Sequence, residues 1–407
     1  MRERPHVVVA GAGPAGAALA YLLARRDFRV TLIERHTDFA REFRGEILMP
    51  SGIDALRQMG LGPAFDALPQ ARPQAIDFHV HGRFVQRFAL PDFMEDTPRM
   101  VSQPRMLEML VAQGEACESF RFVRGGSVAD LIEEGGRSVG VRLRGDAPEE
   151  IRADLVVGCD GRGSVVRRRA GLDEPRNPES FDVIWFKVPL PPQIEPGGAV
   201  QAFLRPGQLC LAFPTFDERL QVAWLIRKGS YGDLRERGTD AWLADIAVQT
   251  GPEIGAHLIR HRDALESPFV LDVVCYLLER WTAPGVLLIG DACHPMSPVG
   301  GQGLNIALRD ALVAANHLVP VLEAGAAARA LDAACAAVQA ERFPEVAEVE
   351  RYQRMPPRVV FRTDWWVGAV LWLAAGLARL GFPRSRVRLP AITRTFLHGV
   401  TDVRLQV

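Results

Sequence analysis

A glycine-rich turn near the amino terminus constrains the fold of this chain more than any other feature. Residues 11–16 read G-A-G-P-A-G and directly follow the apolar run 7–10. Glycines at this spacing allow a tight turn, the close approach of a pyrophosphate, and close packing of a helix against a strand. The pattern therefore predicts a βαβ unit with parallel strands: a strand at 7–10, a helix at 14–25 and a strand at 29–33.

The residue that ends the second predicted strand indicates what the turn binds. Glu34 is placed to accept hydrogen bonds from the hydroxyls of an adenosine ribose. A carboxylate at this position favours free hydroxyls over a phosphorylated ribose, so we expect FAD or NAD more readily than NADP. Only one such turn is present, so a nicotinamide donor would have to bind transiently if FAD occupies it. The predicted cofactor contacts here are Gly11, Gly13, Pro14, Ala15, Gly16, Glu34 and Arg35.

A second glycine-rich segment is suited to the reacting end of a flavin. Gly290 and Asp291 follow the apolar run 286–289 and precede the turn at 298–305. An acid at the end of a buried strand can accept hydrogen bonds from ribityl hydroxyls, and glycines let backbone N–H groups approach the isoalloxazine ring. A helix beginning near Gly303 would direct its positive end at the charge that a reduced flavin carries near N1 and O2.

Composition excludes several classes of function. The 407 residues are 48% hydrophobic, which is enough for a large core and for two domains. A net charge of -1 provides no field to attract phosphate backbones, so we expect no nucleic-acid binding. The six cysteines include no C-x-x-C pair and no signal peptide precedes the first strand, which predicts a cytoplasmic protein. No metal is required.

Alternating apolar and polar residues in the middle of the chain predict a second domain. Strands are expected at 75–90, 181–188, 199–204, 208–213 and 220–226, helices near 242–248 and 253–261, and an antiparallel meander at 120–151. The fold class is α/β, with a Rossmann-type dinucleotide-binding domain, an inserted, mostly antiparallel β substrate domain and a helical C-terminal region. The expected bounds are 1–72, 101–175 and 281–345 for the first domain, 73–100 and 176–280 for the second, and 346–407 for the helical region.

The segment 365–378 is apolar except at its boundaries. It has the length of a buried or interfacial helix and is too short to span a bilayer. Burial against the body of the protein or against a subunit partner is the first interpretation, and peripheral membrane contact is the alternative. The oligomeric state stays open.

A third motif lies between the first two. Residues 156–167 read V-V-G-C-D-G-R-G-S-V-V-R after a predicted strand at 155–158. Together with the opening turn and the Gly290–Asp291 segment, this motif resembles the class A FAD-dependent aromatic hydroxylases, which have the p-hydroxybenzoate hydroxylase fold. The resemblance covers residues 7–317 and weakens through the middle domain. It implies that Asp160 and Gly161 lie near the FAD pyrophosphate and take part in nicotinamide binding; the alternative is that Asp160 only caps the helix that starts near Ser164.

The resemblance also assigns roles around the flavin ring. Residues 290–310 match the family's G-D-A-x-H, P-x-G-G-x-G and N-x-x-x-x-D patterns, with a departure at Cys293, where a small residue is common. It implies that the backbone of Pro298 faces both the flavin and the substrate hydroxyl. His294 is a candidate base, although orienting the loop explains it more readily. The predicted flavin contacts of this segment are Asp291, Gly301, Gly303, Leu304 and Asn305.

Three further positions match the family. Arg44, followed by Gly45, is similar to an arginine that lies by the flavin and takes part in its in-and-out movement, and such a side chain can interact with FAD phosphate or ring oxygens. Gln103 occupies the place where the family has an arginine or glutamine that reaches the FAD, with Arg105 as the competing choice. Val128 corresponds to a backbone contact with adenine.

Candidate substrate residues come from the middle domain. Asp77, His79 and His81 alternate along one predicted strand, and a histidine there could relay a proton from a phenol. The solvated face of a sheet would also explain this alternation. The candidates for lining a substrate pocket, which core packing would explain equally well, are Phe203, Phe213, Pro214 and Trp224. The predicted catalytic residues are Pro298, Arg44 and His79.

The resemblance implies an FAD-dependent monooxygenase. NADH or NADPH would reduce FAD, oxygen would add at C4a, and the hydroperoxide would hydroxylate or epoxidise an electron-rich small molecule. The expected substrates are aromatic, polyketide or prenylated compounds. A flavin-dependent reductase of prenyl double bonds and a non-catalytic FAD-binding redox sensor are the alternatives.

Overall fold

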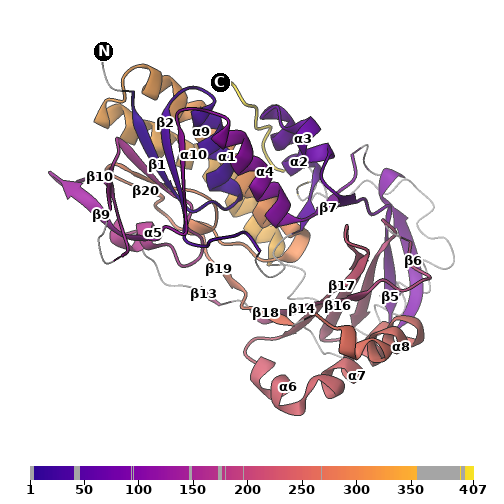
Figure 1. Cartoon of the computed structure of the whole chain (residues 1–407). Helices are drawn as coiled ribbons and strands as arrows, with labels where there is room; N and C mark the ends of the chain where they lie inside the picture. The colour runs from indigo at the N-terminus through magenta and orange to yellow at the C-terminus, as the bar shows by residue number, and fades with distance from the viewer. Residues whose placement is uncertain are drawn as a thin grey trace.

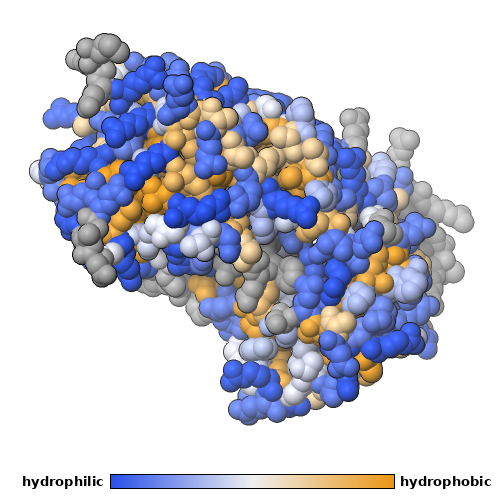
Figure 2. Space-filling view, viewed as in Figure 1, coloured by the Kyte–Doolittle hydropathy of each residue, from blue (hydrophilic) through white to orange (hydrophobic). Residues whose placement is uncertain are grey.

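Two sheets in separate lobes organise the computed structural model of this chain (Figure 1). The structure describes residues 4–40, 46–92, 94, 96–145, 149–172, 177–178, 180–195, 197–266, 268–354, 395 and 399–407. The predicted residues Arg44 and Gly45 and the segment 365–378 lie outside these ranges. In the space-filling view polar side chains cover most of the visible surface, and apolar side chains gather mainly on the lobe that holds the first sheet (Figure 2).

The first lobe is built on a six-stranded sheet. Its strands, in order across the sheet, are β20 (Thr282–Ala283), β21 (Val286–Leu288), β12 (Leu155–Gly158), β1 (His6–Ala10), β2 (Arg29–Glu34) and β8 (Phe120–Arg124). All neighbours pair in parallel except β20 with β21. The helix α1 (Pro14–Ala24) connects β1 to β2, so the predicted βαβ unit is confirmed.

The two faces of this sheet are covered differently. Val7 and Val9 of β1 pack on the face that carries α1, α4 (Gln103–Glu115) and α9 (Gln302–Glu323). Val8 and Ala10 pack on the other face, against a three-stranded antiparallel sheet and α5 (Val165–Arg169). Because both faces are buried, the central strands read as continuous apolar runs.

The meander expected at 120–151 is only partly correct. Its last three strands, β9 (Val128–Glu134), β10 (Arg137–Leu143) and β11 (Glu150–Arg152), form the antiparallel sheet. Its first strand, β8, instead pairs in parallel with β2. The reason is that the preceding helix α4 returns the chain to the edge of β2, as a crossover does, and a short β-rich run does not show which strand it will pair with.

The second lobe is built on a seven-stranded sheet. Its strands, in order, are β18 (Phe269–Leu271), β14 (Phe181–Pro189), β17 (Arg219–Arg227), β16 (Gln208–Pro214), β15 (Val200–Arg205), β5 (Ala75–Val80) and β6 (Arg83–Ala89). All pairs are antiparallel except β15 with β5, which confirms a mostly antiparallel inserted sheet. The domain boundaries stay predictions.

Helices cover one face of the second sheet and the first lobe lies against the other. Phe203 and Trp224 pack with α7 (Thr239–Thr250) and α8 (Pro252–Arg260), beside α6 (Tyr231–Arg237). Trp185 and Phe213 point to the opposite face, where they pack with Ile47. We call the face that packs against α7 and α8 the helix-covered face, and the face that carries Trp185 and Phe213 the inner face. Alternate residues of a strand point to opposite faces, so each strand contributes to both.

Small elements connect the lobes and complete the fold. The strands β3 (Ile47–Leu48), β7 (Arg99–Val101) and β4 (Gln70–Ala71) form one sheet, and β13 (Asn177–Pro178) pairs with β19 (Val274–Cys275). The helices α2 (Pro50–Gln58) and α3 (Gly62–Asp66) precede β4, and α10 (Ala328–Gln353) packs on α9. Within the described ranges, no helix has the length and apolar character needed to cross a membrane.

The segment 399–407 returns to the first lobe. Val403 is 3% exposed and joins the core that contains α1 and α9. Its carbonyl oxygen accepts a hydrogen bond from Gln58 Nε2 at 3.1 Å, and the backbone N–H of Leu405 donates to Gln58 Oε1 at 2.7 Å. This segment is therefore an integral part of the lobe that begins with β1.

Candidate functional site

The three sequence motifs meet at one edge of the parallel sheet. They follow the carboxyl ends of the neighbouring strands β1, β12 and β21. Cys159 donates its backbone N–H to Ala10 O at 2.7 Å, and an added Cβ at Gly290 would lie 3.2 Å from Ala15 Cβ. Ligands bind at this edge in open α/β sheets. Segments that lie more than a hundred residues apart in sequence thus form one site.

Two glycines of the opening turn are required by packing within the chain. Gly11 has φ +99°, and an added Cβ would lie 2.4 Å from Cys159 O. An added Cβ at Gly16 would lie 2.0 Å from Gly11 O. No side chain fits at either position, so both glycines serve the close approach of strand, turn and helix.

Gly13 differs from Gly11 and Gly16, and the space around it shows whether a cofactor fits at this turn. Its φ of -70° and ψ of -178° suit any residue, and an added Cβ would meet no described atom within 4 Å. Neither backbone strain nor packing among the described residues explains this glycine. Gly13 also precedes α1, whose first N–H groups receive no side-chain cap. A pyrophosphate close to the backbone at a helix N-terminus explains both observations.

Glu34 holds the turn in shape. It is 3% exposed, its Oε2 accepts a hydrogen bond from Ala12 N at 3.0 Å, and its Oε1 accepts one from His36 N at 3.1 Å. Neighbouring Arg35 donates its Nε to His36 Nε2 at 3.0 Å. Sequence reasoning assigned Glu34 to a ribose and missed this second role, in which the carboxylate positions the loop that precedes α1.

Asp160 caps α5, as the alternative interpretation of the third motif expects. Its Oδ2 accepts hydrogen bonds from Val165 N at 2.6 Å and from Val166 N at 3.2 Å, and Ser164 Oγ donates to its Oδ1. Gly161 has φ +76°, a backbone conformation that favours glycine in the turn before α5. Arg162 Nε lies 3.6 Å from Asp291 Oδ2 and links this motif to the Gly290 segment. Nicotinamide contact by Asp160 or Gly161 stays a prediction.

The turn before α9 is fixed by contacts with β3 and α2. Gly301 has φ +60°, and an added Cβ there would lie 2.4 Å from Ile47 Cγ2. Asn305 Oδ1 accepts a hydrogen bond from Met49 N at 2.8 Å, and its Nδ2 donates to Gly301 O at 2.7 Å. The Asn305 side chain is therefore used to hold the turn. Leu304 is 6% exposed, and an added Cβ at Gly303 would meet no described atom within 4 Å.

Pro298 begins this turn, and its carbonyl oxygen accepts a hydrogen bond from Gly301 N at 3.0 Å. Half-exposed residues along this edge of the sheet include Gly11, Gly13, Pro14, Asp160, Gly161, Asp291, Pro298, Gly301 and Gly303. Several predicted FAD contacts therefore lie in this strip and are accessible to a ligand, whereas Ala15, Gly16, Glu34, Leu304 and Asn305 are buried.

His294 orients the loop. Its Nε2 lies 2.7 Å from Asp310 Oδ2, and the same oxygen accepts a hydrogen bond from Gly290 N at 3.1 Å. His294 is 1% exposed. Burial disfavours its charged form, but the Asp310 carboxylate raises the pKa of His294 above its ordinary value. A buried histidine paired in this way holds the segment 290–294 onto α9.

Asp310 belongs to a larger buried network of charges. Its Oδ1 accepts from Arg342 Nε at 2.8 Å, and Arg342 also pairs with Glu345. Arg309 Nη2 donates to Glu345 Oε1 at 2.8 Å and to Thr401 O at 2.6 Å. This network ties α9, α10 and the segment 399–407 beneath the predicted flavin site. Sequence reasoning matched Asp310 to a family pattern but found none of its partners.

The structure does not bring His79 to this site. His79 lies on the helix-covered face, where its ring centroid is 4.6 Å from that of Phe203 and its Nε2 is 2.7 Å from Gln201 Oε1. Val299, next to Pro298, packs against the inner face. His81 is not in the strand at all; it has φ +51° and lies in the turn after β5.

The four candidate pocket residues also divide between the two faces. Phe203 and Trp224 pack among the helices, which supports the core interpretation for both, whereas Phe213 lies on the inner face. Pro214 ends β16. Alternation along a strand identifies two faces but not which face will meet a distant loop.

The remaining predicted contacts lie at the starts of secondary-structure elements. Gln103 is the first residue of α4, and Arg105 N donates to the cap residue Ser102 at 3.4 Å. Val128 begins β9 and is 7% exposed. Their contacts with FAD stay predictions, as do those of Arg44 and Gly45.

A buried ion pair between the lobes was missed by sequence reasoning. Glu46, next to β3, lies 3.6 Å from the Nζ of Lys187 on β14, and Lys187 is 1% exposed. Asp217 Oδ2 lies 3.1 Å from the same Nζ. Burial raises the pKa of Glu46 to about 7, and Lys187 opposes this shift. Lys187 and Lys228 are the only lysines of the chain, a rarity that could have drawn attention to this position.

We expect Glu46 to make stability depend on pH between about 4.5 and 7. Its folded-state pKa is raised above the ordinary value of 4.5, so its stabilising effect is full below pH 4.5 and is lost as the pH rises through 7. The free energy of unfolding should fall by about 3 kcal/mol over this range, because one pKa unit corresponds to about 1.4 kcal/mol. Urea unfolding of wild type and Glu46→Gln from pH 4.5 to 8 measures it: the variant should lack this decline. Parallel curves for the two proteins would contradict the assignment.

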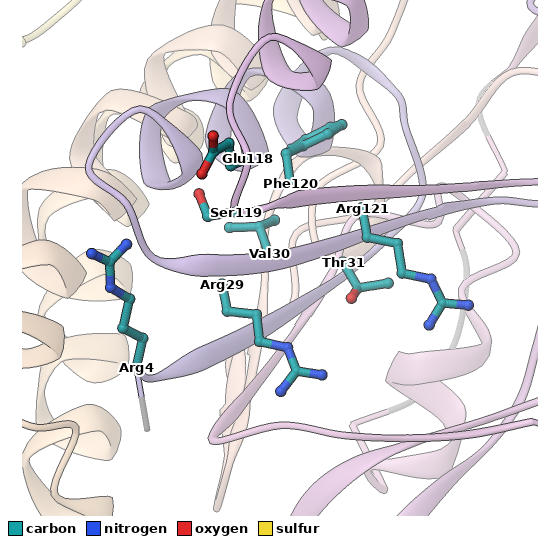
Figure 3. Close-up of a pocket in the computed structure, with 8 residues that line it drawn as sticks. All are labelled: Arg4, Arg29, Val30, Thr31, Glu118, Ser119, Phe120 and Arg121. Carbon is teal, nitrogen blue, oxygen red and sulfur yellow. The ribbon is translucent and has the colours of Figure 1, made fainter. Parts of the chain in front are cut away.

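An open cavity of about 520 Å³ lies at the other edge of the parallel sheet (Figure 3). It is lined by Arg4, Arg29, Val30, Thr31, Glu118, Ser119, Phe120 and Arg121. Arg29 begins β2 and Phe120 begins β8, so the cavity faces away from the three motifs. The guanidinium group of Arg4 points away from those of Arg29 and Arg121, and Arg121 pairs with Glu149 at 2.8 Å. The cavity is therefore separate from the candidate site.

Comparison with known proteins gives the relationships of the chain. Residues 4–351 match the model of a family described as FAD binding domain. The chain is 35% identical over 91% of its length to a 6-methylpretetramide 4-monooxygenase from Streptomyces rimosus, covering 88% of that protein. It is 31% identical over 86% of its length to a 12-dehydrotetracycline 5-monooxygenase/anhydrotetracycline 6-monooxygenase from Streptomyces rimosus subsp. rimosus, covering 69% of it.

A solved structure shares the fold. The crystal structure of p-nitrophenol 4-monooxygenase PnpA from Pseudomonas putida aligns with a TM-score of 0.80 over 98% of this chain and 99% of that chain. The sequence identity is 18%, so this likeness concerns the fold alone. It agrees with the expected Rossmann-type domain and inserted sheet.

Proposed function

Since this chain belongs to the FAD binding domain family and is an FAD-dependent monooxygenase, we propose that its substrate is a hydroxylated aromatic compound with fused rings. The two Streptomyces relatives are named for the oxygenation of 6-methylpretetramide and of tetracycline derivatives. The observation that carries the proposal is the inner face of the seven-stranded sheet, where Trp185, Leu211 and Phe213 lie beside Ile47 of the flavin lobe. Flat aromatic side chains suit a flat aromatic substrate.

The residues along the edge of the parallel sheet would hold FAD. The N-terminus of α1 and the open position at Gly13 suit the pyrophosphate, Glu34 suits the ribose, and Asp291 suits the ribityl chain. The chemistry that bound FAD would supply is hydride acceptance from NADH or NADPH and oxygen activation. The chain itself supplies orientation, charge stabilisation and the exclusion of water.

Residues near the start of α9 would position the reacting groups. The helix N-terminus provides partial positive charge, because its first N–H groups have no side-chain cap. We propose that the Pro298 backbone faces the substrate hydroxyl, as the family resemblance implies, and that His294 holds the loop that carries Asp291. Arg44 stays a proposed contact of the flavin. His79 has no part in this arrangement, because it lies on the helix-covered face.

The monooxygenase activities of the relatives favour oxygenation over the saturation of prenyl double bonds or redox sensing without turnover. We also propose a cytoplasmic location, which is in keeping with six cysteines that are all free thiols. The membrane contact proposed for 365–378 concerns residues outside the described ranges.

Turnover under isotopic oxygen tests the function. Holoenzyme with NADH or NADPH and ¹⁸O₂ is screened against phenols, hydroxylated polyketides and prenylated compounds. We expect one labelled oxygen atom in the product and faster NAD(P)H oxidation when substrate is added. An unlabelled, saturated product formed without oxygen would indicate the reductase, and no sustained oxidation with any donor would indicate the sensor.

A further inference from the structure

Tryptophan and glutamine side chains form a satisfied pair on the helix-covered face of the second sheet. Trp224 Nε1 donates to Gln249 Oε1 at 3.1 Å, and Gln249 Nε2 donates to Phe203 O at 3.0 Å. Buried polar atoms in protein cores are normally partnered in this way. Trp224 and Gln249 therefore show how a buried tryptophan and a buried glutamine are hydrogen-bonded in this chain when their role is structural.

The same two residue types lie on the inner face without such partners. Gln221 on β17 is opposite Lys187 on β14, and Trp185 is opposite Ala223, so Trp185 and Gln221 are diagonal neighbours on adjacent strands. Trp185 Nε1 and Gln221 Oε1 are both buried, and neither has a hydrogen-bond partner among the residues that the structure describes. A donor and an acceptor thus lie side by side, each unsatisfied, which costs stability.

The surroundings of this pair are apolar and aromatic. Phe213 on β16 is directly opposite Gln221, and its ring lies edge-to-face with that of Trp185, with centroids 6.4 Å apart. Leu211 and Ile47 belong to the same cluster. Ile47 is the residue that an added Cβ at Gly301 would touch, so the pair lies on the side of the sheet where the Pro298–Gly301 turn is found.

The neighbouring charged side chain, Lys187, is paired with other groups and not with Trp185 or Gln221. Lys187 is engaged by Glu46 and Asp217, and its Nζ lies 5.2 Å from the centroid of the Phe216 ring. A neutral ligand group that both donates and accepts hydrogen bonds fits this pair better than an anion, because the Trp185 donor lacks an acceptor and the Gln221 acceptor lacks a donor among the described residues.

We propose that Trp185 Nε1 and Gln221 Oε1 hold the substrate by two hydrogen bonds to one ring edge. Trp185 donates to a carbonyl or hydroxyl oxygen, and Gln221 accepts from a neighbouring phenolic hydroxyl. Phe213 and Leu211 contact the ring face. The ligand class is a fused-ring aromatic compound that carries a phenol and a second oxygen substituent along the same edge, and this assignment rests on the proposed function.

Calorimetric titration of the FAD-loaded enzyme with emodin, a trihydroxylated anthraquinone, tests this assignment. Gln221→Leu and Trp185→Phe should each weaken emodin binding about tenfold, the effect of one lost hydrogen bond. Emodin trimethyl ether, which cannot donate a hydrogen bond, should bind the wild type weakly, and Gln221→Leu should not weaken it further. Because each substitution removes an unsatisfied buried atom, both variants should melt at a temperature equal to or about 1–2 °C above that of wild type.

Trp224→Phe is the matched control. It removes the satisfied donor on the helix-covered face and leaves Gln249 Oε1 unpaired, so the Tm should fall while emodin affinity stays within about twofold of wild type. The proposal is overturned if wild type does not bind emodin, if both inner-face variants bind it as wild type does, or if Trp224→Phe weakens binding equally. FAD content and NAD(P)H-driven peroxide formation, measured on the same samples, report on the proposed function independently.

Discussion

Replacing Gly13 by valine should give a folded protein that does not retain FAD. The backbone angles at Gly13 suit valine, and an added Cβ meets no described atom, so the fold has no reason to change. The side chain would instead occupy the space that a pyrophosphate needs at the start of α1. We expect FAD affinity to fall by about two orders of magnitude, a loss of about 2.7 kcal/mol. Absorbance at 450 nm after purification, with circular dichroism for the fold, measures both effects.

Gly16→Val is the matched control for this experiment. At Gly16 an added Cβ would lie 2.0 Å from Gly11 O, so this variant should not accumulate as folded protein. The two glycines belong to one motif, but packing within the chain requires only Gly16, and Gly13 is the one predicted to contact the ligand. Yellow, fully loaded protein from Gly13→Val would show that the open space at this position does not receive the cofactor.

Replacing Asp310 by asparagine should lower the free energy of unfolding by about 3–5 kcal/mol, the range for breaking a buried ion pair. Asp310 is 0% exposed and binds Arg342, His294 and Gly290 N together. Asparagine removes the charge that offsets the buried Arg342 guanidinium, and its single amide oxygen cannot accept both from Arg342 on one side and from Gly290 and His294 on the other. Urea unfolding at pH 7 measures the loss.

The pH dependence of this loss has a definite sign. Burial disfavours the charged form of Asp310, but His294 and Arg342 hold its pKa below the ordinary value. Its stabilising effect is therefore present above the ordinary carboxyl pKa and is lost as the pH falls through the lowered value. Wild type and Asp310→Asn should converge in acid. The half-exposed pair of Glu150 with Arg142 is the control, because Glu150→Gln should cost less than about 1 kcal/mol. Equal losses at both sites would contradict the role given to the network.

The parallel sheet and its motifs could be predicted because they depend on local signals. A glycine turn between a strand and a helix needs only its own residues and one acid, Glu34, to be recognised. The motifs at Asp160 and Gly290 each follow a short apolar run, and parallel strands bring the ends of such runs to one edge. Family resemblance then supplied the roles that spacing alone does not.

The remaining features depend on pairings between distant segments. His79 looked catalytic because alternation marks a face, but only the parallel pairing of β15 with β5 sets it against Phe203 on the helix-covered side. The Glu46–Lys187 pair joins residues that lie 141 positions apart on different lobes. The unsatisfied Gln221 is opposite Lys187 only through the register of β14 and β17. The residues adjacent in sequence give no signal of such distant neighbours.

The anchoring of Val403 bears on how the protein matures during synthesis. The strand β1 is translated about 150 residues before its neighbour β12, and the Gln58 and Arg309 side chains find their partners only at Val403 and Thr401. Because loops that close over such distances form slowly, the nascent amino-terminal half remains incomplete until residue 403 has been translated. A chain that stops before Thr401 and Val403 lacks the partners of Arg309 and Gln58, so the support beneath the FAD site should be among the last contacts of this lobe to form.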